Sequence, residues 1–127
     1  MDAELSRSQA ELLNPIEARR QWPRFRRRLQ LNYFVDHIGW QRGWRDGFTT
    51  DAGPAGMRVV SLFVPEIGRN LRLSVEVPGA GALALWGRVA WSESSAAAAA
   101  RTPTCFGVVL TAAPETWFHY WRGALDS

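Results

Sequence analysis

The chain has 127 residues, of which 46% are hydrophobic, so its length and apolar content suit one small domain with a single core. It lacks any run of roughly 18 or more apolar residues, which argues against a membrane-spanning helix and predicts no insertion into a membrane. A single cysteine, Cys105, excludes an internal disulfide, and the N-terminus lacks the charged and then apolar order of a signal peptide. We therefore expect a cytoplasmic protein.

The net charge of +3 arises in one short cluster of the chain. Residues 19–28 hold six arginines and no acidic residue, whereas residues 1–18 are acidic and the rest of the chain is balanced. Guanidinium groups bind phosphate oxygens through two parallel hydrogen bonds and also stack on flat rings. The cluster therefore favours a phosphate-binding segment, and the alternative is a solvated basic arm.

The N-terminal part of the chain differs in pattern from the remainder. Residues 3–18 show weak helical periodicity, interrupted at Asn14-Pro15. This pattern predicts an acidic N-terminal segment over 1–18, helical or disordered, ahead of a domain over 19–127.

From Leu29 the hydrophobic pattern has period two, which is typical of a strand with one buried face. The residues predicted to face the core here are Leu29, Leu31, Tyr33 and Val35. Residues 36–47 look like a loop that carries Trp40 and Trp44. Further strands are predicted over Phe48 to Asp51, Met57–Val64, Leu71–Val77, Leu83–Trp91 and Cys105–Leu110, with turns between them and a low-complexity loop over 94–100.

A terminal helix is predicted to begin at Ala113-Pro114-Glu115, with proline in its first turn. Its apolar residues are Trp117, Phe118, Tyr120, Trp121 and Leu125. The fold class is therefore all-β with a terminal helix, as about six short strands suggest a closed or nearly closed antiparallel barrel. Periodicity alone does not separate this barrel from an SH3-like or OB-like one.

Two short motifs flank the first long strand. Arg20 and Arg24 have the spacing RxxxR, and Asp51, Gly53 and Gly56 form DxGxxG at a turn between strands. In this order, with GRVAW and FGVVL downstream, they resemble the signature motifs of the PilZ domain family, RxxxR and (D/N)xSxxG. The resemblance covers Arg19 to Leu125. It departs at one position, where Gly53 replaces the serine.

The resemblance implies a six-stranded antiparallel barrel with a C-terminal α-helix that binds cyclic di-GMP. Arg20 and Arg24 would contact the phosphates and guanines of this ligand, and Arg19 would stack on a second ligand molecule. A second RxxxR register, Arg24 with Arg28, is also present. Without a partner motif, the basic segment would be an ordinary solvated arm.

The second motif would contact the base edges of the same ligand. Asp51 would accept hydrogen bonds from the guanine N1–H and amino group, because an ionised carboxylate only accepts. Gly56 would permit a positive φ at the turn. Gly53 offers no hydroxyl, and Trp91 at the end of GRVAW would stack on a purine. The alternatives are a plain tight turn and a packing role for Trp91.

Catalysis and metal binding have little support in the sequence. His37 and His119 are far apart, and neither belongs to a catalytic or metal-binding motif. Cys105 lies within an apolar strand, which predicts a buried packing residue and not a nucleophile. We expect no enzyme, no metal and no cofactor apart from the ligand.

Three functions remain open at this stage. The first is a cyclic di-GMP receptor that relays the second messenger to a protein partner in motility, adhesion or biofilm control. The second is a PilZ-like adaptor that no longer binds the nucleotide and contacts proteins, or a second copy of the chain, through Trp40, Trp44 and the terminal helix. The third is a nucleic-acid-binding barrel, against which the neutral charge outside residues 19–28 argues.

Overall fold

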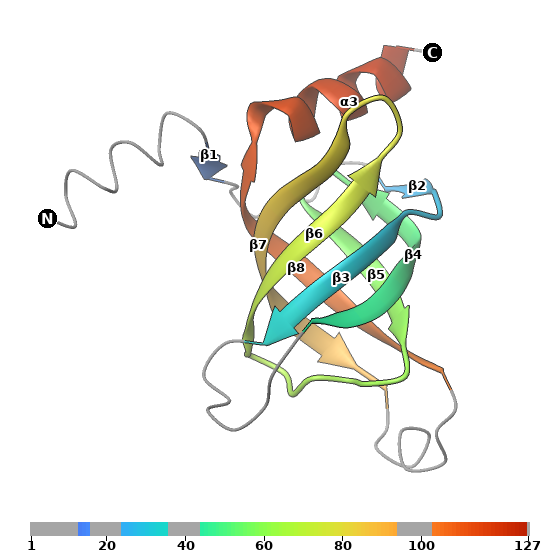
Figure 1. Cartoon of the computed structure of the whole chain (residues 1–127), viewed down its shortest axis with the longest axis vertical. Coiled ribbons are helices and arrows are strands. Elements are labelled where there is room, and N and C mark those ends of the chain that lie inside the picture. Colours follow the sequence, from blue (N-terminus) through green and yellow to red (C-terminus); the bar gives the residue numbers. More distant parts are fainter. Residues whose placement is uncertain (1–12, 16–23, 36–43, 94–102, 127) are drawn as a thin grey trace, which may run out of the picture.

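The computed structural model describes residues 13–15, 24–35, 44–93 and 103–126 (Figure 1). These ranges contain eight strands and one helix: β1 (Leu13–Pro15), β2 (Phe25–Arg26), β3 (Gln30–Val35), β4 (Arg45–Gly53), β5 (Gly56–Ser61), β6 (Asn70–Val77), β7 (Gly81–Ser92), β8 (Thr104–Pro114) and α3 (Glu115–Asp126).

Six of the strands close a barrel. They run in the order β8-β5-β4-β3-β6-β7, every pairing is antiparallel, and β7 pairs back with β8. β1 adds an outer strand beside the end of β8, and β2 pairs with β4 ahead of β3. Helix α3 lies across one end of the barrel (Figure 1). The predicted all-β fold, a six-stranded antiparallel barrel with a C-terminal helix, is confirmed.

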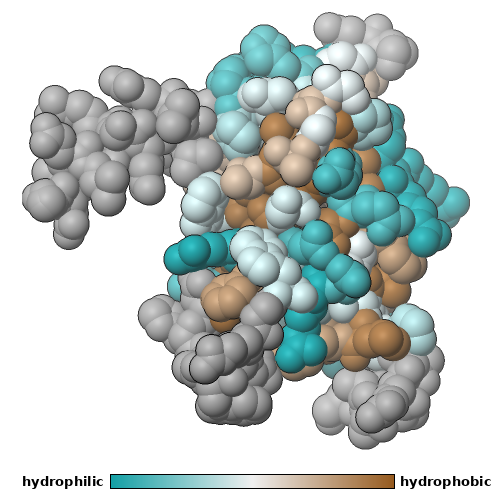
Figure 2. Space-filling model, in the orientation of Figure 1, coloured by the Kyte–Doolittle hydropathy of each residue, from teal (hydrophilic) through white to brown (hydrophobic). Residues whose placement is uncertain are grey.

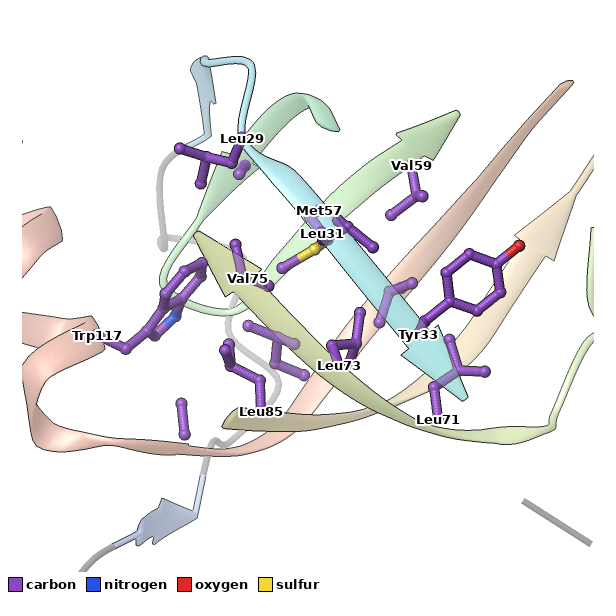
Figure 3. Close-up of a cluster of buried hydrophobic side chains, with 14 of the residues drawn as sticks. Leu29, Leu31, Tyr33, Met57, Val59, Leu71, Leu73, Val75, Leu85 and Trp117 are labelled. Atoms are coloured by element: carbon purple, nitrogen blue, oxygen red, sulfur yellow. The ribbon is translucent and has the colours of Figure 1, made fainter. Parts of the chain in front are cut away.

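The core fills the inside of the barrel and extends under α3. The side chains of Leu29, Leu31, Tyr33 and Val35 are buried as the period-two pattern predicts, and alternate residues of β6 join them. Figure 3 shows Trp117 and Tyr33 on opposite sides of this cluster. Each large apolar side chain buried here contributes about 1.5–3 kcal/mol relative to an exposed one. Trp117 and Trp121 are fully buried, so one face of α3 covers the core.

Tyr33 places a polar hydroxyl group at one end of the apolar core. Its hydroxyl lies 2.5 Å from the carbonyl oxygen of Phe63, to which it donates, and 2.8 Å from Oγ of Ser61. Ser61 in turn donates to the carbonyl of Asp46, so the hydroxyls join three segments of the chain. Burial raises the pKa of Tyr33 to about 12, because the phenolate would lose its hydration inside the barrel.

Several predicted boundaries were wrong. The second predicted strand begins at Arg45, within the expected loop. Gly47 belongs to this strand and not to a loop, and it lies close to β5, because a Cβ built on it would be 3.0 Å from the carbonyl oxygen of Val60. β5 ends at Ser61 and not at Val64. β8 continues through Pro114, so the helix begins at Glu115 and proline precedes its first turn.

Residues 13–15 are also corrected, because they form β1 and not part of a helix. The residue before a proline is disfavoured in the α region, and an edge strand tolerates the missing N–H of Pro15. The rest of the segment expected over 1–18 lies outside the described residues, as do Arg19, Arg20, His37 and Trp40. Within the described ranges, no helix has both the length and the apolar character that crossing a membrane requires.

Candidate ligand-binding site

Arg24 and Asp51 join the two motifs directly. The residues are 27 apart in the sequence, and Nη1 of Arg24 donates to Oδ1 of Asp51 over 2.6 Å. The Arg24 side chain is 45% exposed and that of Asp51 is 28% exposed, so a ligand can reach both from solvent. The pairing of residues Phe25 and Arg26 with Ala52 and Asp51 holds the backbone of β2 in this place.

A buried threonine fixes the segment between β2 and β3. The hydroxyl of Thr49 accepts the N–H of Leu29 over 2.8 Å and donates to the carbonyl of Arg27 over 2.5 Å. The register of β4 against β5 then shifts by one residue between Thr49 and Asp51, which is a β-bulge. Bulges redirect side chains in a strand, and here Asp51 lies partly exposed beside Arg24.

Gly56 has a different role from the one predicted. It is not among the glycines with positive φ, so the turn does not need it for that reason. Instead, a Cβ at Gly56 would lie 2.7 Å from the carbonyl oxygen of Val108 and 3.3 Å from Nη2 of Arg24. Gly53 pairs with Gly56 across the hairpin and is buried. Gly56 therefore lets β8 and Arg24 approach the turn closely.

The pairing register places a row of residues across neighbouring strands. Asp51 of β4 is paired with Arg58 of β5, Arg58 with Gly107 of β8, and Gly107 with Trp91 of β7. Arg26 of β2 is paired with Asp51 at the other end of the row. At the usual strand spacing the row is about 19 Å long. It connects the two motifs with the predicted stacking residue Trp91.

Arg58 lies at the centre of this row and was not predicted. Its guanidinium carbon is 5.7 Å from the centre of the Trp91 ring, and its Nη2 lies 3.5 Å from Sγ of Cys105. The hydrogen bond to Cys105 raises the pKa of Arg58, and the nearby carboxylates of Asp51 and Glu93 act in the same direction. Cys105 is partly exposed, so the prediction of a buried packing residue was wrong.

The basic segment alternates between the site and α3. Arg24 and Arg26 are exposed, whereas Phe25 stacks on Trp121 with ring centres 5.4 Å apart. Arg27 donates to the hydroxyl of Tyr120, and its guanidinium lies over the rings of Tyr120 and Trp121. The edge of the molecule formed by β2 and β4 is hydrophilic in Figure 2 (teal, right).

Helix α3 also contacts the turn of the second motif. The indole N–H of Trp117 donates to the carbonyl oxygen of Pro54 over 3.1 Å, in a buried position. Pro54 lies between Gly53 and Gly56, so one turn of α3 is bonded to the DxGxxG segment. The same helix is therefore packed against the turn of the second motif and against Phe25 and Arg27, which follow the first motif.

The structure thus brings Arg24, Asp51, Gly53 and Gly56 together and places Trp91 further along the same row. Arg28, from the alternative RxxxR register, lies over the ring of Phe48, 3.9 Å from its centre, and not beside Asp51. Two signals in the sequence pointed to the residues that were missed. Arg58 lies two residues after Gly56, which places it on the same face of a strand, and Gly107 interrupts the apolar run FGVVL, which indicates close approach.

Other chemistry is sparse in the described part of the chain. No group of three or more potential metal ligands is found there. His119 is exposed on α3, with its Nε2 3.8 Å from Oε2 of Glu115 on the preceding turn. This contact is an ordinary surface pair.

No protein-family model matches the sequence, and no curated protein matches it. The solved structure of the Bacillus subtilis inhibitor of motility (MotI/DgrA) is similar in fold, with a TM-score of 0.64 and 15% sequence identity. The match covers 87% of this chain and 53% of that one, so the chain spans about half of that protein's length. At this identity the likeness concerns the fold alone, and the barrel with its terminal helix is PilZ-like.

Proposed function

We propose that the protein is a cyclic di-GMP receptor of the cytoplasm that relays the level of this second messenger to a protein partner. The contact between Arg24 and Asp51 beside Gly56 carries the proposal, because it unites two motifs that are far apart in the sequence. The solved structure of similar fold is an inhibitor of motility. Control of motility is accordingly the output we propose, with adhesion or biofilm formation as related outputs.

The geometry supports an exchange of partners when the ligand binds. An exposed ion pair such as Arg24 with Asp51 contributes only about 0–1 kcal/mol, so opening it costs little. Asp51 would then accept the N1–H and amino group of a guanine, and Arg24 would bind a phosphate. Each charged hydrogen bond of this kind is worth about 1.5–3 kcal/mol.

The rest of the row suits the other parts of the ligand. Arg26 and Arg58 lie on either side of Asp51 and add positive charge where the phosphates would lie. Trp91 is 39% exposed and offers a flat ring for a purine. Arg19 and Arg20 remain part of the proposal on the resemblance of their motif.

Isothermal titration with cyclic di-GMP tests the proposal. We expect the wild-type protein to bind and Arg24→Ala to lose binding, because the variant removes the cation and leaves Asp51 unpaired. Arg69→Ala is the matched control: Arg69 is 40% exposed and forms an ion pair with Glu66, but lies in the β5–β6 connection. Binding by Arg24→Ala with wild-type affinity would refute the site.

A ligand-free adaptor is the second candidate, and the exposed apolar residues favour it. Trp44 is 50% exposed, and Leu62 and Ile67 are each 63% exposed. If a folded wild-type protein gives no heat with cyclic di-GMP, this function replaces the receptor. It predicts that Trp44→Ala loses a partner in a pull-down, and a variant that retains every partner would exclude Trp44 from the interface.

A further inference from the structure

The indole of Trp91 occupies the place of a side chain that β8 lacks. Trp91 and Gly107 are paired across β7 and β8. A Cβ built on Gly107 would lie 2.0 Å from Nε1, 2.4 Å from Cε2 and 2.6 Å from Cδ1 of Trp91. These three atoms belong to the five-membered ring, so this ring lies directly over the backbone of Gly107.

Gly107 differs from its alternate neighbours in β8 because it lacks a side chain. The alternate residues Cys105 and Val109 are partly exposed on the same side of β8, and each carries a side chain. Gly107 itself has no solvent exposure of note, because the indole covers it. Its φ is not in the left-handed region, so backbone conformation does not require glycine here. Space for Trp91 is the physical reason that remains.

Arg58 borders the indole on the side of β5. Its guanidinium lies 5.7 Å from the ring centre, which is within the range of a cation–π contact. The guanidinium is held in place by the hydrogen bond from Nη2 to Sγ of Cys105. Its Nε is buried without a partner among the described residues. The arginine is therefore held by Nη2 and by the ring of Trp91.

We propose that Gly107 and Arg58 are positioning residues that fix Trp91 as a flat binding surface for one purine ring. This inference rests on the proposed function, since it assigns the ring of the ligand to one part of the same site. Trp91 as a whole residue is 39% exposed, so a ligand can reach it from solvent. A ring already held in place loses little conformational freedom on binding, which is why fixing Trp91 raises affinity.

A double-mutant cycle tests the role of Gly107. We expect Gly107→Ala to displace the indole and to weaken cyclic di-GMP binding about five- to 150-fold, the range of one base–aromatic stack. Trp91→Ala should weaken binding by a similar factor, and the double variant should be no weaker than Trp91→Ala alone. Gly123→Ala on α3 is the control, because a Cβ there meets nothing within 4 Å.

The cycle also guards against a folding defect. If Gly107→Ala alone is unfolded and the double variant is folded, the added methyl group and the indole compete for one space, as proposed. If Gly107→Ala binds cyclic di-GMP like the wild type, the proposal is wrong. Equal additional losses from Gly107→Ala in both backgrounds would also overturn it.

A second readout does not need the ligand. The indole N–H signal of Trp91 in a 1H–15N NMR spectrum is identified by its loss in Trp91→Ala. We expect Gly107→Ala and Arg58→Lys each to shift this signal, the latter because lysine keeps the charge but lacks the planar group. If the wild type binds no cyclic di-GMP, the proposed function fails, and this signal still decides the positioning role. An unmoved signal in both variants would refute it.

Discussion

Glycine occupies three positions around the candidate site, and each has a different role. Gly56 admits Val108 and Arg24, and Gly107 admits the ring of Trp91. Gly53 stands where the motif of the resembling family has serine, and it is buried in the β4–β5 hairpin. The missing hydroxyl removes one potential hydrogen bond to a ligand, but it leaves the contact of Arg24 with Asp51 intact.

Restoring the hydroxyl should strengthen binding. We expect Gly53→Ser to raise the affinity for cyclic di-GMP about two- to twelvefold, which corresponds to one neutral hydrogen bond of about 0.5–1.5 kcal/mol. Isothermal titration measures the change. Gly53→Ala is the control, as it adds the Cβ without the hydroxyl. If both variants bind alike, the hydroxyl is not responsible for any gain.

At the scale of elements, α3 contacts both the turn of the second motif and the segment that follows the first motif. Trp117 bonds to Pro54 of the turn, and Trp121 stacks on Phe25 of the basic segment. The two tryptophans differ in one respect. The indole N–H of Trp117 has an acceptor, whereas Nε1 of Trp121 is buried without a partner among the described residues.

This difference predicts unequal effects of the same substitution. Trp117→Phe removes a hydrogen bond and leaves the buried carbonyl of Pro54 unpaired, which costs about 1–3 kcal/mol beyond the loss of ring volume. Trp121→Phe loses ring volume but also removes an unpaired buried donor. We therefore expect Trp117→Phe to lower the free energy of unfolding more than Trp121→Phe. Urea unfolding followed by circular dichroism measures both, and equal losses would contradict the assigned bond.

The sequence predicted the strands and the helix better than it predicted which residues of different strands lie side by side. Period two marked β3, and the motifs marked Arg24, Asp51 and Gly56. The row through Arg58 and Gly107 depends on strand register, which the hydrophobic pattern of a single strand does not determine. Thr49, which precedes the bulge, is hydrogen-bonded to residues twenty or more positions away. The hydrogen bonds of Thr49 are set by tertiary structure and leave no local pattern.

At the scale of the whole molecule, the barrel separates two polar regions. One is the turn of the second motif beside α3, where Trp117 is bonded to Pro54. The other surrounds the hydroxyl of Tyr33, on the opposite side of the buried cluster (Figure 3). The core between them is continuous and apolar. A change at the hydroxyl of Tyr33 should therefore act on the stability of the barrel and not on the contact of Arg24 with Asp51.

Tyr33 predicts a loss of stability at high pH. Its pKa rises from 10.0 to about 12 on folding, so below pH 10 the Tyr33 hydroxyl is protonated in both the folded and the unfolded chain. Above pH 10 the unfolded chain loses the proton first, and the free energy of unfolding falls as the pH rises. At pH 11 the loss from this group is about 1.4 kcal/mol, equal to one pKa unit.

Tyr33→Phe isolates that contribution. The variant should be less stable than the wild type at pH 8, because it lacks the hydrogen bond to the carbonyl of Phe63. The difference between the two proteins should shrink from pH 10 to pH 11 as the wild type loses stability. Guanidinium unfolding at several pH values measures this difference. A constant difference across that range would show that Tyr33 does not titrate as described.

The contacts of α3 with the turn and with the basic segment have a thermodynamic consequence. Any movement of the turn or the basic segment on ligand binding must alter contacts made by Trp117 or Trp121. If cyclic di-GMP binding gives α3 a second arrangement, a protein that binds only one of the two arrangements would change the affinity for the nucleotide. By linkage, the nucleotide would change the affinity for that protein by the same factor. The partner would then be an effector of the receptor as much as its target.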